Sequence, residues 1–203
     1  MKKGKMISGL VLMGMCVLGV SVAQGGTIGR SYVDGGYQLV RLGSFDGGDN
    51  VLDQGWMGVR LGGLENMDAV FSFAGGTLDG YTIRSLNAGL QPYFKPEEGI
   101  YKVFADIRVI YTDVTNDGSD YSESGVGVMG GIGSELDLIP DTLSVLGEFA
   151  YISEGANIES ADDFKIMGSI NYWATKWLMI EAGMGYGTTT EDFTLTLGLG
   201  VGF

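Results

Sequence analysis

Histidine is absent from all 203 residues, and this absence excludes several classes of chemistry at once. Without histidine the chain has no Ser-His or Cys-His catalytic pair and no His-ligated zinc site. Two carboxylates could still act together as acid and base. We nevertheless expect the acidic residues to pair with Arg and Lys, so the sequence predicts neither an enzyme nor a cofactor.

Cysteine occurs once, as Cys16, within an amino-terminal apolar stretch from Met6 to Val22. Three lysines precede this stretch, and Ser21-Val22-Ala23 fits the small-x-small rule for cleavage. We therefore predict a signal peptide over residues 1–23 and a mature chain over 24–203. The alternative is a membrane-anchoring helix that is not cleaved. Cleavage would remove Cys16 and leave a mature chain without a disulfide.

Basic residues are scarce, with 12 Lys and Arg against 25 Asp and Glu. The predicted signal peptide holds three of the bases and no acid, so the mature chain has a net charge of −16. This charge disfavours nucleic-acid binding, because phosphates would be repelled. It would suit a disordered chain, but 45% hydrophobic residues and 36 glycines oppose disorder.

Long uncharged apolar runs are also missing after residue 23, but alternating segments of about ten residues are frequent. The last segment, 193–203, is the clearest, because its apolar side chains fall on one face while Thr and Gly fall on the other. A period of two indicates a strand, and one apolar face beside one small or polar face is typical of a transmembrane β-barrel. The apolar positions of this segment are Phe193, Leu195, Leu197, Leu199, Val201 and Phe203.

The sequence thus predicts an all-β fold, an antiparallel up-and-down transmembrane β-barrel, with ten strands. The third strand is the weakest, and a barrel of eight strands follows if Met67 to Gly80 is irregular. A soluble barrel or sandwich is a further alternative. The predicted strands are residues 31–42, 55–63, 67–75, 81–94, 100–113, 125–138, 143–153, 163–173, 177–187 and 193–203.

The connections alternate in length, which predicts the orientation of the barrel. Outer-membrane barrels have long external loops and short periplasmic turns, so both termini are expected in the periplasm. The long acidic connections are residues 44–54, 115–124 and 154–162. The short ones are residues 64–66, 96–99, 140–142 and 175–176.

The fifth strand illustrates the two faces. Its outward positions from Tyr101 to Tyr111 form an aliphatic band with a tyrosine at each end, as in an aromatic girdle. Further girdle candidates are Tyr37, Phe94, Phe149, Tyr151, Phe164, Tyr172 and Tyr186.

Alternation also collects ionisable residues on the inner faces of the strands. A small barrel is only wide enough for side chains, and buried charges are expensive unless paired. We therefore expect a charge-paired, largely plugged lumen; the alternative is a narrow porin-like channel for ions or small polar solutes. The predicted lumen charges are Asp34, Arg60, Lys102, Asp106, Arg108, Glu135, Glu148, Lys165 and Glu181.

Two apparent motifs carry little weight. Residues 125–130 match G-x-G-x-x-G but lie in a glycine-rich strand without a βαβ unit. Residues 113–118 begin like an EF-hand loop, but no acid stands at its twelfth position, Ser124, and no helices flank it. A looser cation site is the alternative to a solvated external loop, and its candidate ligands are Asp113, Asp117, Asp120 and Glu123.

The closing strand and the loop asymmetry resemble those of small bacterial outer-membrane β-barrel proteins, such as the opacity-type family. The resemblance implies an assembly signal at Leu199, Val201 and Phe203 that is read by the barrel-assembly machinery. It also implies an outer-membrane location, contact with membrane lipid and lipopolysaccharide, and a monomer. The function expected is of a structural or surface-interaction type with acidic external loops. No catalytic or ligand motif of any subfamily can be transferred.

Overall fold

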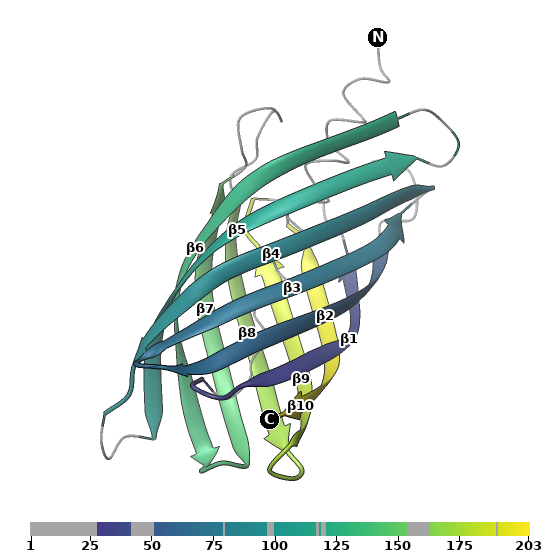
Figure 1. The fold of residues 1–203 in the computed structure, drawn as a ribbon. Coiled ribbons are helices and arrows are strands. Elements are labelled where there is room, and N and C mark those ends of the chain that lie inside the picture. The colour runs from purple at the N-terminus through teal and green to yellow at the C-terminus, as the bar shows by residue number, and fades with distance from the viewer. Residues whose placement is uncertain are drawn as a thin grey trace.

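Ten antiparallel strands make up the fold in the computed structural model, as the sequence predicts (Figure 1). The structure describes residues 28–41, 51–78, 80–96, 100–116, 118, 121–153, 163–189 and 191–203. In this part of the chain no helix is long and apolar enough to cross a membrane. The strands are β1 (Tyr32–Arg41), β2 (Val51–Leu64), β3 (Met67–Leu78), β4 (Tyr81–Phe94), β5 (Tyr101–Asn116), β6 (Tyr121–Ile139), β7 (Leu143–Ser153), β8 (Asp163–Trp173), β9 (Leu178–Gly187) and β10 (Phe193–Gly202).

Each strand pairs with its neighbours in the chain, and β1 pairs with β10 to close the barrel. The closing register joins Tyr32 to Gly202 and Arg41 to Phe193. The third strand is regular and pairs along its length with β4, so the eight-stranded alternative is wrong. Closure removes the unpaired edges that a flat sheet would expose.

Burial alternates along the strands, so the two predicted faces are real. On β5 the even-numbered residues from Lys102 to Val114 are buried, while Ile107 and Val109 are exposed on the outside. Tyr101 and Tyr111 also lie outside, at the two ends of this aliphatic band. Of the other girdle candidates, Tyr151 is half-buried. The remaining candidates are exposed: Tyr37, Phe94, Phe149, Phe164, Tyr172 and Tyr186.

Two of the long connections are shorter than the sequence predicts. β2 begins at Val51 instead of Gly55, and β5 and β6 extend to Asn116 and Tyr121. The segments predicted as loops over 51–54 and 115–124 are therefore largely strand. Antiparallel pairing uses backbone groups, so polar side chains at the rim do not end it.

Two of the short turns contain a residue with a left-handed backbone conformation. Asn66 and Asp141 adopt φ values of 56° and 58°. Asn and Asp tolerate this conformation better than most residues, which explains their place in the turns. The predicted signal peptide and the loop residues 44–50 and 154–162 lie outside the described residues.

Candidate functional site: the barrel interior

The barrel interior is the candidate site, because all nine predicted lumen charges have buried side chains there. Each stands on the inward face of its strand, and none is more than 5% exposed. The structure adds carboxylates that the sequence pattern did not select: Asp68, Asp163 and Asp192.

A chain of polar side chains crosses four adjacent strands inside the barrel. Arg60 on β2 bonds Asp68 on β3 at 3.1 Å and also contacts the side-chain carbonyl of Gln91 on β4. The Gln91 amide donates to Asp106 on β5 at 3.2 Å. Asp106 in turn accepts two bonds from Arg108, of which the Nε bond is 2.6 Å long. The planar guanidinium groups of Arg60 and Arg108 suit this bridging.

Lys102 forms a second cluster nearer the short turns. Its ammonium group lies 2.9 Å from Glu135 and 3.4 Å from Asp137 on β6. Glu135 also accepts the backbone N–H of Ile28 at 2.8 Å, although Ile28 precedes the first strand. The cluster therefore ties β5 and β6 to the segment that leads into the barrel.

That segment, Ile28–Ser31, lies in the mouth at the short-turn end. The Ile28 side chain is buried against Phe104 and Leu146, on strands across the interior. The Gly29 N–H donates to Asp68 at 2.9 Å, and Arg30 pairs with Asp141 and lies 4.8 Å from the centre of the Trp173 ring. Sequence reasoning missed this segment, because it has no alternation and no charge pattern that would indicate burial.

Lys165 holds a third cluster toward the other end of the barrel. Its ammonium group lies 2.8 Å from Asp163 and 2.6 Å from Asp192, and the three side chains are almost completely buried. The Thr189 N–H donates to Asp163 at 2.9 Å, so the cluster also holds the β9–β10 connection. Asp192 lies in that connection, which is why strand alternation could not identify it.

Asp34, Glu148 and Glu181 complete the set of buried acids. Within the described residues, Asp34 and Glu148 have no basic group within ion-pairing distance. The sequence predicts that all nine lumen charges pair, and the structure does not bring these two into pairs.

Apolar and neutral polar side chains fill further levels of the interior. Ile110, Met129 and Met167 pack together with neighbours from β7, and Gln54 donates to Gln38 at 2.7 Å. On β10, inward glycines leave room for large side chains: a Cβ at Gly198 would lie 2.7 Å from the Trp56 ring.

The candidate cation ligands do not come together. The register pairs Asp113 with Ser124 and Val114 with Glu123, so Asp113 and Glu123 face opposite sides of the sheet. Asp117 and Asp120 lie outside the described residues. Among the residues that the structure describes, no three acidic side chains are grouped as metal ligands would be.

The proposed assembly-signal residues lie on the outer face of β10. Leu199, Val201 and Phe203 are exposed, and the Phe203 N–H donates to the Ser31 carbonyl at 3.1 Å. Their recognition by an assembly machinery remains a prediction.

Comparisons with known proteins identify the fold but no family. No protein-family model and no curated protein matches the sequence. Among solved structures, an outer-membrane channel from Pseudomonas putida F1 aligns with a TM-score of 0.57 at 11% identity, covering 89% of this chain and 97% of the other. The translocator domain of the autotransporter NalP from Neisseria meningitidis aligns over 98% of this chain and 97% of its own, with a TM-score of 0.49 at 10% identity. Neisserial surface protein A aligns over 85% and 97%, with a TM-score of 0.47 at 12% identity. The chain shares its fold with outer-membrane β-barrels.

Proposed function

We propose that this chain is an outer-membrane β-barrel of structural or surface-interaction type, with an interior closed by its own side chains. Its outward apolar residues would face lipid, and its short turns and amino-terminal segment would face the periplasm. The acidic external connections would be presented to the surroundings. The protein would act as a monomer and without enzymatic activity.

The observation that carries this proposal is the occupation of the interior at successive levels. The Ile28 segment and the Lys102 cluster occupy the short-turn end, and the Arg60–Arg108 chain lies beside them. The Lys165 cluster occupies the opposite end. A permeating ion must replace its hydration shell with ligands from the protein. Side chains that are already paired and buried do not supply such ligands.

Single-channel recording tests this proposal. We expect the refolded mature chain to insert into planar bilayers and to conduct no steady current. Arg108→Ala should lower the free energy of unfolding by about 3–5 kcal/mol, because it leaves Asp106 buried without the guanidinium that contacts it twice. Uniform current steps from the wild-type protein would overturn the closed interior.

A narrow cation channel is the second candidate, and the balance of buried charge favours it. Eight buried carboxylates face four buried bases, and Asp34 and Glu148 lack a close basic partner in the described structure. An interior with excess negative charge would favour cations. Under this candidate, Arg108→Ala would raise conductance, and the current would reverse at a potential set by cations.

A further inference from the structure

A shallow apolar groove of about 450 Å³ runs over the outer face of β2–β5. Its floor is Ala88, which lies in register between Phe71 and Val109, two much larger side chains. The next row toward the long connections is formed by larger residues, which make the upper edge of the groove: Met57, Phe73, Leu86 and Tyr111. The groove therefore has the width and apolar lining that an acyl chain fits.

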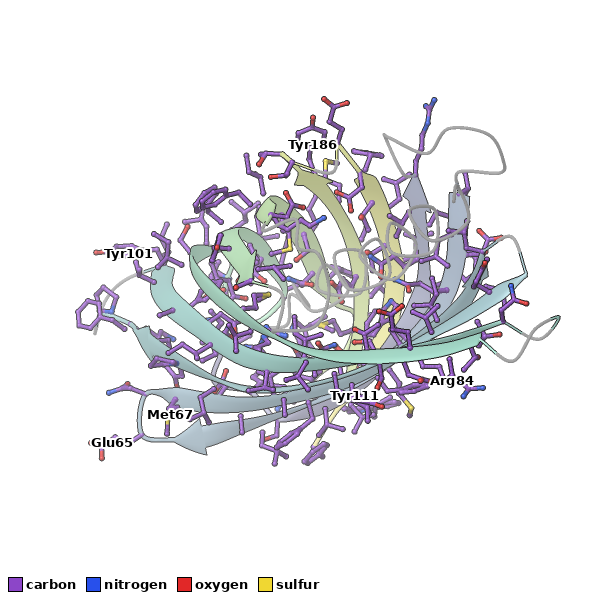
Figure 2. The ribbon with its side chains drawn as sticks, turned by 90° about the horizontal axis from the view of Figure 1, so that it is seen from above. Glu65, Met67, Arg84, Tyr101, Tyr111 and Tyr186 are labelled. Atoms are coloured by element: carbon purple, nitrogen blue, oxygen red, sulfur yellow. The ribbon has the colours of Figure 1, made fainter. Side chains whose placement is uncertain are left out.

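Arg84 lies next to this groove, on the side toward the long connections. It is two residues from Leu86 on the same face of β4, a rise of about 7 Å. Its side chain is 58% exposed, and a smaller cavity joins it to Leu86 and Tyr111 at the upper edge. Figure 2 shows Arg84 and Tyr111 pointing outward from the same side of the barrel.

Two glycines leave open space beside the guanidinium. Gly75 is paired with Arg84 across β3 and β4, and Gly55 is paired with Gly75 across β2 and β3. A Cβ would lie no closer than 3.6 Å to other atoms at Gly75 and 3.9 Å at Gly55, so the backbone does not require glycine at either position. The row forms a flat shelf across two strand spacings, about 10 Å, next to a cation.

Positive charge is scarce at this end of the molecule: among the described strands, only β1 and β4 carry an exposed basic residue there, Arg41 and Arg84. The connections 42–50, 117–120 and 154–162 contain no Lys or Arg, and the mature chain is strongly acidic. Within the described residues, the ion-pair partner of the guanidinium is Asp113, at 4.0 Å, which is the outer limit of an ion pair. Such a group is well placed to bind an anion, because it remains exposed and its existing partner is distant.

We propose that this face binds a phosphorylated glycolipid of the outer leaflet. The phosphate would lie on Arg84, the sugar on the Gly55–Gly75 shelf, and one acyl chain in the groove around Ala88. The shelf is wider than a glycerol phosphate needs, which favours the glycolipid over a phospholipid. This inference rests on the proposed membrane location, with the long-connection end outside.

Native mass spectrometry of the folded full chain in neutral detergent tests the proposal, with diphosphoryl lipid A as the probe. We expect Arg84→Gln to weaken binding about tenfold through loss of a charge-assisted hydrogen bond. Gly75→Val and Ala88→Phe should weaken it by filling the shelf and the groove. Asp113→Asn should strengthen it, because a carboxylate next to the phosphate is removed.

Lys95→Gln is the matched control, since it removes an exposed positive charge at the opposite end of β4. It should leave lipid A binding unchanged. Equal binding by wild type and Arg84→Gln, or equal binding of dephosphorylated lipid A, would overturn the phosphate contact. Equal, Arg84-dependent binding of phosphatidylglycerol would overturn the choice of a glycolipid, and a lipid-free dimer that Ala88→Phe disrupts would assign the groove to a second copy.

Insertion is measured separately on the same samples. Protection of the strands from protease in vesicles reports whether the chain is a membrane barrel at all. A protein that inserts but binds lipid A without regard to Arg84 would contradict only the glycolipid site. A chain that does not insert would contradict the proposed function itself.

Discussion

At the scale of single residues, ion pairs inside the barrel hold segments that are distant in the chain. Lys165 contacts Asp163 on its own strand, β8, and Asp192 in the connection between β9 and β10. A buried ion pair adds little net stability compared with apolar packing, but removing one partner is costly. Replacing one member of an interior ion pair should therefore lower the free energy of unfolding more than replacing both members together.

Lys165→Met tests this sensitivity. We expect the free energy of unfolding to fall by about 3–5 kcal/mol, because two buried carboxylates lose the ammonium group that they both contact. Urea unfolding in lipid vesicles measures the change. Adding Asp163→Asn and Asp192→Asn should recover part of it, while Lys176→Met at the exposed turn should change stability by less than about 0.5 kcal/mol. A fall no larger than that of Lys176→Met would contradict the interpretation.

The sequence identified nine of the twelve charges that are buried among the described residues, missed Asp68, Asp163 and Asp192, and did not indicate which charges pair. Strand alternation places Arg60, Asp106 and Arg108 on the inner face without further information. Pairing depends on the register and stagger between strands, which alternation does not specify. Asp192 and the Ile28 segment lie outside any alternating segment, so their burial could be found only from the structure.

At the scale of the strands, the β1–β10 seam is packed most closely at Gly36. A Cβ there would overlap the carbonyl oxygen of Leu197 and would lie 2.7 Å from the Cα of Gly198. Both atoms belong to the backbone, so no side chain can move aside. Glycine at position 36 lets the first and last strands approach one another.

Gly36→Ala should therefore destabilise the barrel by about 1–3 kcal/mol. The loss of closure should appear as a smaller fraction of fast-migrating, heat-modifiable protein in a gel assay. Gly147→Ala is the control, because nothing lies within 4 Å of a Cβ at that outward position. Equal behaviour of the two variants would show that the seam tolerates a side chain.

The strands themselves were largely predictable, because along each strand the side chains alternate between the barrel interior and the apolar outer face. The ends of β2, β5 and β6 were not, because polar residues continue to pair beyond the apolar pattern. Ser122, Glu123 and Ser124 read as a loop in the sequence, yet they pair with Thr115, Val114 and Asp113. Backbone hydrogen bonds at the rim are compatible with water on both faces.

At the scale of the whole molecule, the outer surface is an apolar belt with aromatic residues toward its ends. Leu197, 66% exposed, stands in the middle of β10, and Phe193 stands at its start. Such a belt would be unfavourable in water over this area and is stable next to lipid.

The position of a charge on this belt should decide its cost. Leu197→Lys should destabilise the barrel in vesicles by about 2–4 kcal/mol, and Phe193→Lys, close to the rim, by about 0–1 kcal/mol for the charge itself. Urea titration of both variants in the same vesicles gives the comparison, with Phe193→Ala correcting for the lost ring. Equal costs after that correction would mean that the belt does not span a bilayer.

The pairing of β1 with β10 also determines at which step of folding the barrel can close. Tyr32 and Gly202 are partners although nearly the whole described part of the chain separates them, so this contact cannot form until the last strand has been made. Non-local contacts are slow to form, because a long loop must be closed first. Until then β1 and β9 each present an open edge that a strand of another molecule could join. The chain is therefore vulnerable to aggregation until β10 has formed, and closure of the barrel removes both open edges in one final step.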